Sequence, residues 1–241
     1  MFNNIPPITR NLIILNIVVF IAANLIPALD LNLTAFYPFS PNFQSWQIIT
    51  HMFMHVSIMH ILFNMFTLFS FGPILEQSLG DKKYLILYFL SGLGAFFLFN
   101  LWNFIEIQQL VTQLSEMNID VSEIYKMSEL KTYGYSETAF GEQPLARELY
   151  EGLTGGMLGA SGAVFGVIAA FATLYPDARI GIMFIPIPVK VKYVLPVVVI
   201  GSIYLGVTGN VGGIAHLAHV GGAIVGFILA KIWKKHLYRF N

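Results

Sequence analysis

The chain has 241 residues, of which 56% are hydrophobic and only 11% are charged, and its mean hydropathy is +0.69. Because a soluble globular domain carries about 25% charged residues, this composition indicates an integral membrane protein. The formal net charge of zero argues against a nucleic-acid partner. The absence of cysteine excludes cysteine proteases and thiolate metal sites.

Six apolar segments are predicted to cross the membrane as helices, since a crossing needs ~20 mostly apolar residues. In chain order they are residues 11–27, 58–79, 84–104, 161–175, 191–208 and 214–233. The first is long for the apolar region of a signal peptide and lacks a convincing cleavage site, so we expect it to be retained. The sequence therefore predicts an all-α membrane protein with a single domain over residues 1–241.

Basic residues predict the orientation of these helices. Ten of the thirteen lie before the first helix, between the second and third, between the fourth and fifth, or at the end of the sixth. With an even number of helices these four places share one side of the membrane, so we expect both termini to be cytoplasmic. The amino terminus does not resemble a transit peptide, which favours a bacterial plasma membrane.

Two long connections are predicted on the outer side. Residues 28–57 contain a single charge, Asp30, and several aromatic residues, among them Phe36, Tyr37, Phe39, Phe43 and Trp46, so we expect this loop in the membrane interface with Trp46 as an anchor. Residues 105–160 form an acidic loop that we expect in water. Apolar residues at helical spacing predict that the third helix continues into it. They are Ile107, Leu110, Val111 and Leu114.

Polar side chains gather at one depth of the predicted bundle. The second, fourth and sixth helices all enter from the outer side, and their outer ends carry Asn64, Ser161 and five of the six histidines. These histidines are His51, His55, His60, His216 and His219. Ionisable side chains at this depth cost free energy unless they pair or face water, so the layer indicates a functional site.

The fourth predicted helix is short. Its fifteen residues from Ser161 reach about 22 Å, against about 30 Å of hydrocarbon, so we expect it to begin below the outer surface. Ser161 would then lie at a helix amino terminus, where free N–H groups favour a developing negative charge. His60 and Asn64, four residues apart on one face, are candidate donors to such an oxyanion.

Small residues predict how the fourth and sixth helices meet. Gly162 with Gly166, and Gly222 with Gly226, are small-xxx-small pairs that allow close helix approach. Packing through these glycines would bring Ser161 near His219, and a serine needs such an adjacent base to act as a nucleophile. No carboxylate is predicted at this depth, so we expect a Ser-His dyad rather than a triad.

Each of these residues also has a structural explanation. Alone, Ser161 with its glycines is more often a packing motif, and His219 or Asn64 is more often an interior hydrogen-bonding residue. His51 and His55 have a spacing that suits a metal, but the sequence contains no HExxH motif and no GxGD motif. We therefore predict no metal and no cofactor, and we expect these two histidines to anchor the outer loop by hydrogen bonds.

Three short motifs carry the residues of this layer: HVSIMHILFN (55–64), GASG around Ser161, and AHVGGAIVG (218–226). They resemble the H-x-x-x-x-H-x-x-x-N, G-x-S-G and A-H-x-x-G-x-x-x-G motifs of the rhomboid intramembrane serine proteases. The resemblance covers about residues 8–235 and implies a six-helix rhomboid-like bundle whose short central helix carries the nucleophile. It implies that His219, rather than His216, is the base, that His60 and Asn64 form the oxyanion hole, and that His55 is structural.

The sequence departs from the family pattern at three places. Gln47 follows Trp46 where the family often has arginine. Phe165 replaces the tyrosine that well-known bacterial members have four residues after the serine; by the resemblance it stacks on His219 without offering a hydroxyl. The loop 105–160 is longer than in compact members.

The resemblance implies a serine-type endopeptidase that cleaves transmembrane segments near the outer face of the bilayer. Its substrates would be single-pass membrane proteins that approach from the lipid. The alternatives are an inactive rhomboid-like binding protein, and a small transporter whose histidine layer relays protons or holds a metal.

Overall fold

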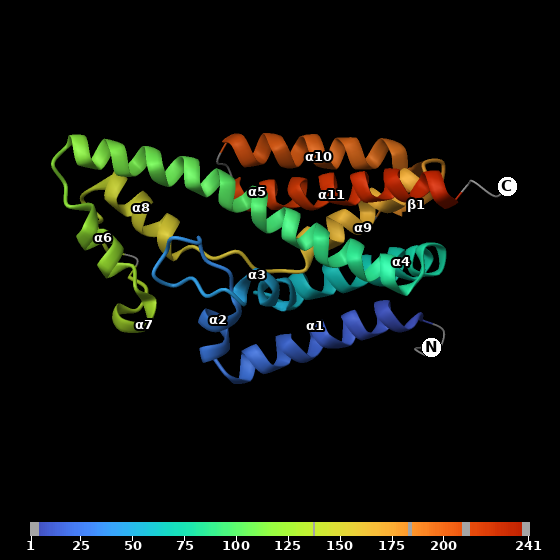
Figure 1. The fold of residues 1–241 in the computed structure, drawn as a ribbon, viewed down its shortest axis with the longest axis horizontal. Coiled ribbons are helices and arrows are strands. Elements are labelled where there is room, and N and C mark those ends of the chain that lie inside the picture. Colours follow the sequence, from blue (N-terminus) through green and yellow to red (C-terminus); the bar gives the residue numbers. More distant parts are fainter. Residues whose placement is uncertain (1–4, 137, 183–184, 209–212, 238–241) are drawn as a thin grey trace.

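A computed structural model describes residues 5–136, 138–182, 185–208 and 213–237 of the chain, which is mostly helical (Figure 1). The helices are α1 (Pro7–Leu25), α2 (Ala28–Leu33), α3 (Gln47–Thr50), α4 (Ile58–Leu79), α5 (Asp81–Glu116), α6 (Val121–Met127), α7 (Leu130–Tyr133), α8 (Pro144–Thr154), α9 (Ser161–Leu174), α10 (Val191–Thr208) and α11 (Gly213–Leu237). A 3-10 helix, η2 (His51–Phe53), precedes α4, and strands β1 (Arg179–Ile182) and β2 (Ile185–Lys190) precede α10.

Four of the described helices are long and apolar enough to cross a membrane: α1, α4, α5 and α11. The apolar helix α9 has 14 residues, and α10 contributes a shorter apolar stretch, Val191–Gly201. Every predicted apolar segment thus falls on a helix. The largest difference in bounds is at the third segment, predicted as 84–104, because α5 runs from Asp81 to Glu116.

Strands β1 and β2 are a difference from the all-α prediction. They pair antiparallel, with Arg179 opposite Lys190 and Ile180 opposite Val189. Isoleucine and valine, which favour extended backbone, recur through both strands. The sequence predicts only a connection here, because each strand is too short to show a clear alternating pattern.

Helix α9 lies at the centre of the bundle, against α4, α5 and α11 (Figure 1). Ten of its 14 residues are buried, whereas α1 buries four of 19. A Cβ atom on Gly222 would overlap the carbonyl oxygen of Gly162, and one on Gly226 would overlap that of Gly166. The backbones of α9 and α11 therefore touch directly, which only glycine permits at these positions.

Glu76 of α4 ties α1 to the bundle. Its carboxylate is buried and accepts hydrogen bonds from the Ile8 N–H at 2.8 Å, the Thr9 N–H at 2.7 Å and the Thr9 hydroxyl at 2.6 Å. The first N–H groups of a helix have no partner within the helix, and a negative charge there is favourable. Glu76 thus caps α1 from a neighbouring helix.

Residues 105–160 fold into a helical subdomain, which we call the insert. It contains the end of α5, then α6, α7 and α8, and it encloses its own apolar core (Figure 1). The fully buried members of this core include Ile107, Leu114, Ile124, Leu149 and Leu153. The helical spacing that predicted an extension of the third helix is explained by this core, since Ile107 and Leu114 face it.

The loop of residues 28–57 is bound to the insert. Tyr37 is buried in the insert core, and the Asn42 amide donates to the Ser128 carbonyl at 2.8 Å. The Asn42 side-chain oxygen accepts from the Leu130 N–H at 2.9 Å. Phe39 and Trp46, by contrast, are 68% and 50% exposed. Part of this aromatic loop therefore packs inside the protein, and part faces outward.

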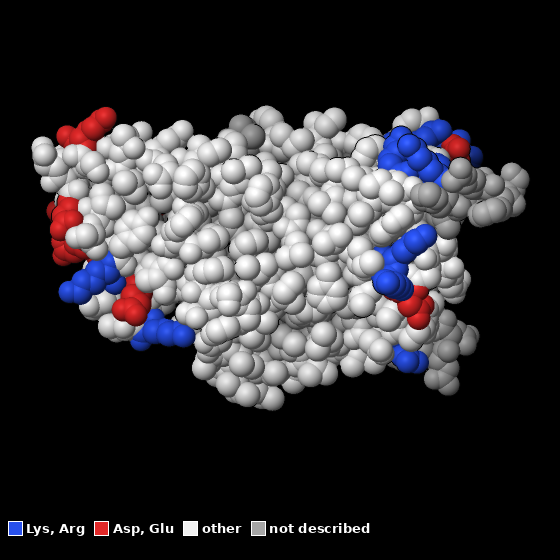
Figure 2. Space-filling model, viewed as in Figure 1, with Lys and Arg blue, Asp and Glu red and all other residues white. Residues whose placement is uncertain are grey.

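Charged side chains separate along the long axis of the molecule. Figure 2 shows most Lys and Arg side chains at the end where both termini lie, and Asp and Glu gathered with a few basic side chains at the end that holds α6 to α8. Between the two ends the visible face is a broad uncharged band. This is the charge pattern of a chain whose middle is surrounded by lipid.

Candidate active site

Ser161 and His219 form a hydrogen-bonded pair. Ser161 is the first residue of α9, His219 lies near the start of α11, and their Oγ and Nε2 atoms are 2.9 Å apart. The direct backbone contact of α9 with α11 brings them together, because Gly222 lies three residues after His219 and packs against Gly162. Both side chains are only partly buried, so the pair is open to a reactant.

The imidazole of His219 is held by aromatic contacts. Phe165, one turn after Ser161 on α9, lies parallel to it with ring centroids 4.3 Å apart and an interplanar angle of 4°. His216 contacts it edge to face at 6.0 Å. The ring is thereby held with Nε2 toward Ser161. No hydrogen bond from His219 to a carboxylate occurs in the part of the chain that the structure describes.

Gly159 and His60 form the next layer around Ser161. Gly159 has φ = +122°, a conformation that other residues rarely adopt. A Cβ atom at Gly159 would lie 2.9 Å from Nε2 of His60 and 3.6 Å from Oγ of Ser161. The imidazole of His60 therefore covers the backbone next to the serine, and glycine is needed there for both conformation and space.

Asn64 lies one turn after His60 on α4 and is buried, 6% exposed. Its amide donates to the His60 carbonyl at 3.0 Å, and the structure records no bond from it to Ser161 or His219. Since a side-chain amide has two N–H groups, this bond occupies one of them. Side chains from three helices, Ser161, His219 and His60, thus lie around the start of α9, and Asn64 lies one turn from His60 on α4.

The Rhomboid domain model matches residues 42–107 and 132–236 of the chain. The chain belongs to the rhomboid family. The matched residues include every motif of the polar layer, and with the four long apolar helices they show that this rhomboid is an integral membrane protein. The unmatched residues 108–131 belong to the insert, where the family model has no counterpart.

His51 and His55 of this rhomboid are buried, 0% and 5% exposed, in the loop of residues 28–57, for which we keep the name outer loop from the predicted topology. His51 Nδ1 lies 2.8 Å from the Gln47 carbonyl, so this nitrogen donates, and the His51 carbonyl accepts from the Gly159 N–H at 2.9 Å. His51 thus connects the outer loop to the segment that precedes Ser161. The ring of His55 contacts that of His60 edge to face at 4.9 Å.

No cluster of three metal-ligating side chains is present among the residues that this structure of the rhomboid describes. His51 and His55, the two candidates that the sequence offered for a metal, are turned to different neighbours: a backbone carbonyl and the ring of His60. The expected hydrogen bond to the loop is present for His51, but the expectation fails for His55, because both of its ring nitrogens are buried without a hydrogen-bond partner among the described residues.

Gln47 takes part in bracing the outer loop. It is fully buried, its amide donates to the Leu31 carbonyl at 3.0 Å, and its side-chain oxygen accepts from the Gln44 N–H at 2.9 Å. The Trp46 indole donates to the Asn32 carbonyl at 2.8 Å while half of the ring remains exposed. In this rhomboid a neutral glutamine therefore holds together the turn at which the family often has arginine.

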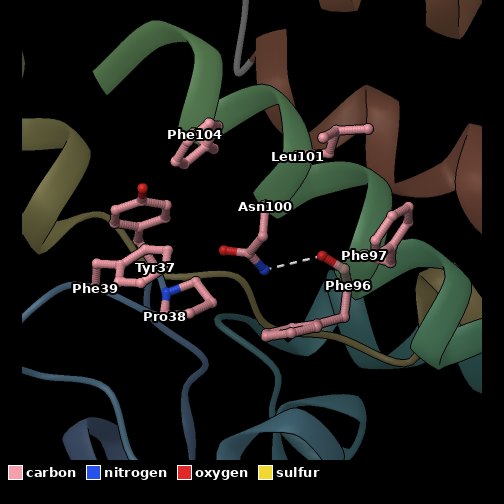
Figure 3. Close-up of a pocket in the computed structure, with 8 residues that line it drawn as sticks. All are labelled: Tyr37, Pro38, Phe39, Phe96, Phe97, Asn100, Leu101 and Phe104. Atoms are coloured by element: carbon pink, nitrogen blue, oxygen red, sulfur yellow. Dashed lines mark hydrogen bonds between the residues drawn. The ribbon is translucent and has the colours of Figure 1, made fainter. Parts of the chain in front are cut away.

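A cavity of about 230 Å³ lies apart from Ser161, between the outer loop and α5 (Figure 3). Figure 3 shows the ring of Tyr37 and the amide of Asn100 on opposite walls, among Phe39, Phe97 and Phe104. Its lining contains no residue of the polar layer, so this cavity is not the candidate active site.

Gly159 and Gln47 are site residues to which the sequence analysis gave no such role. The segment GLTGGMLGA (152–160) before Ser161 contains four glycines, and composition alone does not distinguish which of them has positive φ and lies under His60. Gln47 forms hydrogen bonds with residues three and sixteen positions away in the chain, and no local sequence pattern predicts such bonds.

Proposed function

We propose that this rhomboid is an intramembrane serine endopeptidase that cleaves transmembrane segments of single-pass membrane proteins. The observation that carries the proposal is the 2.9 Å contact between Ser161 Oγ and His219 Nε2 at the amino terminus of α9. A serine becomes nucleophilic when such a base removes its proton, and a helix amino terminus favours the negative charge that then develops.

In the proposed mechanism, His219 Nε2 takes the Ser161 proton while Oγ attacks the scissile carbonyl carbon. The oxyanion is stabilised by the Ser161 backbone N–H and by the side chains of His60 and Asn64, whose second amide N–H is available for this role. His219 then gives its proton to the leaving amine, and water from the outer side hydrolyses the acyl-enzyme. The pair acts as a dyad in which Phe165 holds the imidazole.

We further propose that α9 and α10 also cross the membrane, which makes six spans, with the basic end and both termini in the cytoplasm of a bacterium. The separation of charge in Figure 2 supports this orientation. Because the chain contains no cysteine, a single cysteine introduced at a chosen position can be labelled to show on which side of the membrane that position lies. A membrane-impermeant maleimide added to intact cells should label Lys131→Cys and leave Lys82→Cys unlabelled; the reverse pattern would invert the proposed orientation.

The enzymatic proposal is tested with a fluorophosphonate probe and with cleavage of a single-pass membrane protein in proteoliposomes. Ser161→Ala and His219→Ala should each abolish cleavage, because the two residues act as one unit. Asn64→Ala should slow cleavage by about 10²–10³-fold, the usual value of one oxyanion donor. Ser70→Ala, an exposed serine bonded within α4, is the matched control and should keep full activity. Full activity in Ser161→Ala would refute the mechanism.

The rival functions predict different results in the same preparations. A rhomboid-like binding protein would retain single-pass membrane proteins without cleaving them, and Ser161 would not react with the probe. A transporter would show proton-coupled flux or bound metal that is lost when the histidine layer is changed. Probe labelling that disappears only in Ser161→Ala favours the protease over both.

A further inference from the structure

The cavity between the outer loop and α5 is lined by two residues whose polar atoms lack a hydrogen-bond partner. The side-chain oxygen of Asn100 and the hydroxyl of Tyr37 are both buried without a partner among the described residues. Asn100 is 8% exposed and Tyr37 is 1% exposed, so bulk water does not supply the missing bonds. Buried polar groups in folded proteins are nearly always hydrogen-bonded, so these two atoms point to a bound partner.

The unpartnered oxygen of Asn100 faces the cavity. The Asn100 amide nitrogen donates to the Phe96 carbonyl at 2.8 Å. Because a carbonyl only accepts, this bond fixes the nitrogen toward the backbone and leaves the oxygen free. In Figure 3 this oxygen points from α5 toward the ring of Tyr37 on the opposite wall. It is thus held where a bound molecule would meet it.

The chemistry of the cavity selects a neutral ligand with a hydroxyl group. None of the described residues that line it is charged. The Asn100 oxygen only accepts, so the ligand must donate to it. Burial raises the pKa of Tyr37 to about 12, so its hydroxyl keeps its proton and can donate to the ligand. A hydroxyl group both donates and accepts, and the cavity volume of about 230 Å³ exceeds the ~150 Å³ that holds a benzene ring.

An apolar stripe on α5 leads away from the cavity. Phe97, Leu101 and Phe104 line the cavity, recur at helical spacing and are exposed, Phe97 by 66%. Leu90, two turns before Phe97, continues the exposed stripe. Because α5 is long and apolar enough to cross a membrane, such a face is in contact with acyl chains. The cavity therefore joins a site for a hydroxyl group to a path along which a lipid tail can lie.

We propose that this cavity binds a neutral lipid with a free hydroxyl group, of the diacylglycerol class, with its acyl chains along α5. The lipid hydroxyl donates to the Asn100 oxygen and accepts from the Tyr37 hydroxyl. It thereby joins α5 to the outer loop, which has no such bond between these two residues in the structure. A phosphate headgroup is a poorer fit, because no basic side chain is among the described lining residues. The proposal does not depend on proteolysis.

The test titrates the full chain with dioctanoylglycerol, by native mass spectrometry, in lauryldimethylamine oxide, a detergent without hydroxyl groups. The comparison lipid is the same molecule with its hydroxyl acetylated. We expect the free hydroxyl lipid to bind about tenfold more tightly, because the acetate leaves the Asn100 oxygen without a donor. Asn100→Leu should bind the two lipids equally. Tyr37→Phe removes only a hydroxyl and should lose about fivefold in affinity for dioctanoylglycerol.

Two control variants make the same changes outside the cavity. Asn24→Leu removes an amide that bonds in the same way to the Phe20 carbonyl of α1, and Tyr88→Phe removes a buried hydroxyl from α5. Both should keep the tenfold preference. Thermal unfolding without lipid checks that each variant is folded, and if Asn100→Leu is not, Tyr37→Phe decides.

Three results would overturn the proposal. The first is equal binding of the two lipids to the parent chain. The second is an undiminished preference in Asn100→Leu, or an unchanged affinity in Tyr37→Phe. The third is displacement of dioctanoylglycerol by excess glycerol, which would identify a free polyol rather than a lipid as the source of the hydroxyl group.

Discussion

Replacing Gly222 by alanine should inactivate this rhomboid without touching a reacting group. The new methyl group would overlap the carbonyl oxygen of Gly162. That oxygen belongs to the backbone of α9 and cannot rotate away as a side chain would. The two helices must therefore separate where they now touch, close to the pair formed by Ser161 and His219.

The expected loss of activity follows from how far α9 and α11 must separate and from the present distance between Ser161 and His219. Relieving the overlap requires α9 and α11 to move apart by about 1.5 Å, since non-bonded heavy atoms rest near 3.5 Å. Ser161 Oγ and His219 Nε2, now 2.9 Å apart, would then lie beyond hydrogen-bond reach. A misplacement of about 1 Å costs roughly 10²-fold in rate, and overpacking of this kind costs about 1–3 kcal/mol of stability.

The assay compares the rate of probe labelling at Ser161, the rate of substrate cleavage and the midpoint of thermal unfolding. Gly201→Ala on α10 is the matched control, because a Cβ atom there meets nothing within 4 Å. It makes the same chemical change in a helix and should leave labelling and cleavage unchanged. If Gly222→Ala labels and cleaves at rates within twofold of the parent, the contact between these helices does not position the dyad.

Two other substitutions test contacts that hold the bundle and the insert together. Glu76→Gln replaces an acceptor by an amide facing the N–H groups of Ile8 and Thr9, and should lower the free energy of unfolding by about 1–3 kcal/mol; Glu116→Gln, at the exposed end of α5, should have no measurable effect in the same detergent titration. Asn42→Ala removes the partner of the Leu130 N–H and should increase hydrogen exchange in residues 121–133. Unchanged exchange there would show that Asn42 does not hold α7.

Local sequence pattern was sufficient for the long apolar helices and for the start of α9. The predicted bounds 58–79 and 191–208 coincide with α4 and α10, because long apolar runs that end at glycine or at charged residues define such helices. The glycine pairs predicted a close approach of α9 and α11, and Gly222 does lie against Gly162. The roles proposed for Ser161, His219, His60 and Asn64 stay predictions until activity is measured.

Contacts between distant segments could not be predicted. Glu76 makes three hydrogen bonds to residues 67 or 68 positions away, and these bonds depend on how α1 docks. The core of the insert combines Tyr37 with residues more than 65 positions later in the chain. Such contacts depend on tertiary packing, which a single sequence without a structural template does not reveal.

Helix α5 has 36 residues, which at 1.5 Å per residue span about 54 Å, well beyond the ~30 Å of a bilayer core. Its far end is built into the insert, and six residues, Gly155–Ala160, lead from α8 to Ser161. Ser161, the proposed nucleophile, is therefore connected by a short tether to the folded body of the insert. An antibody or a soluble inhibitor that displaces α8 would pull on the serine from the aqueous side, without ever entering the lipid.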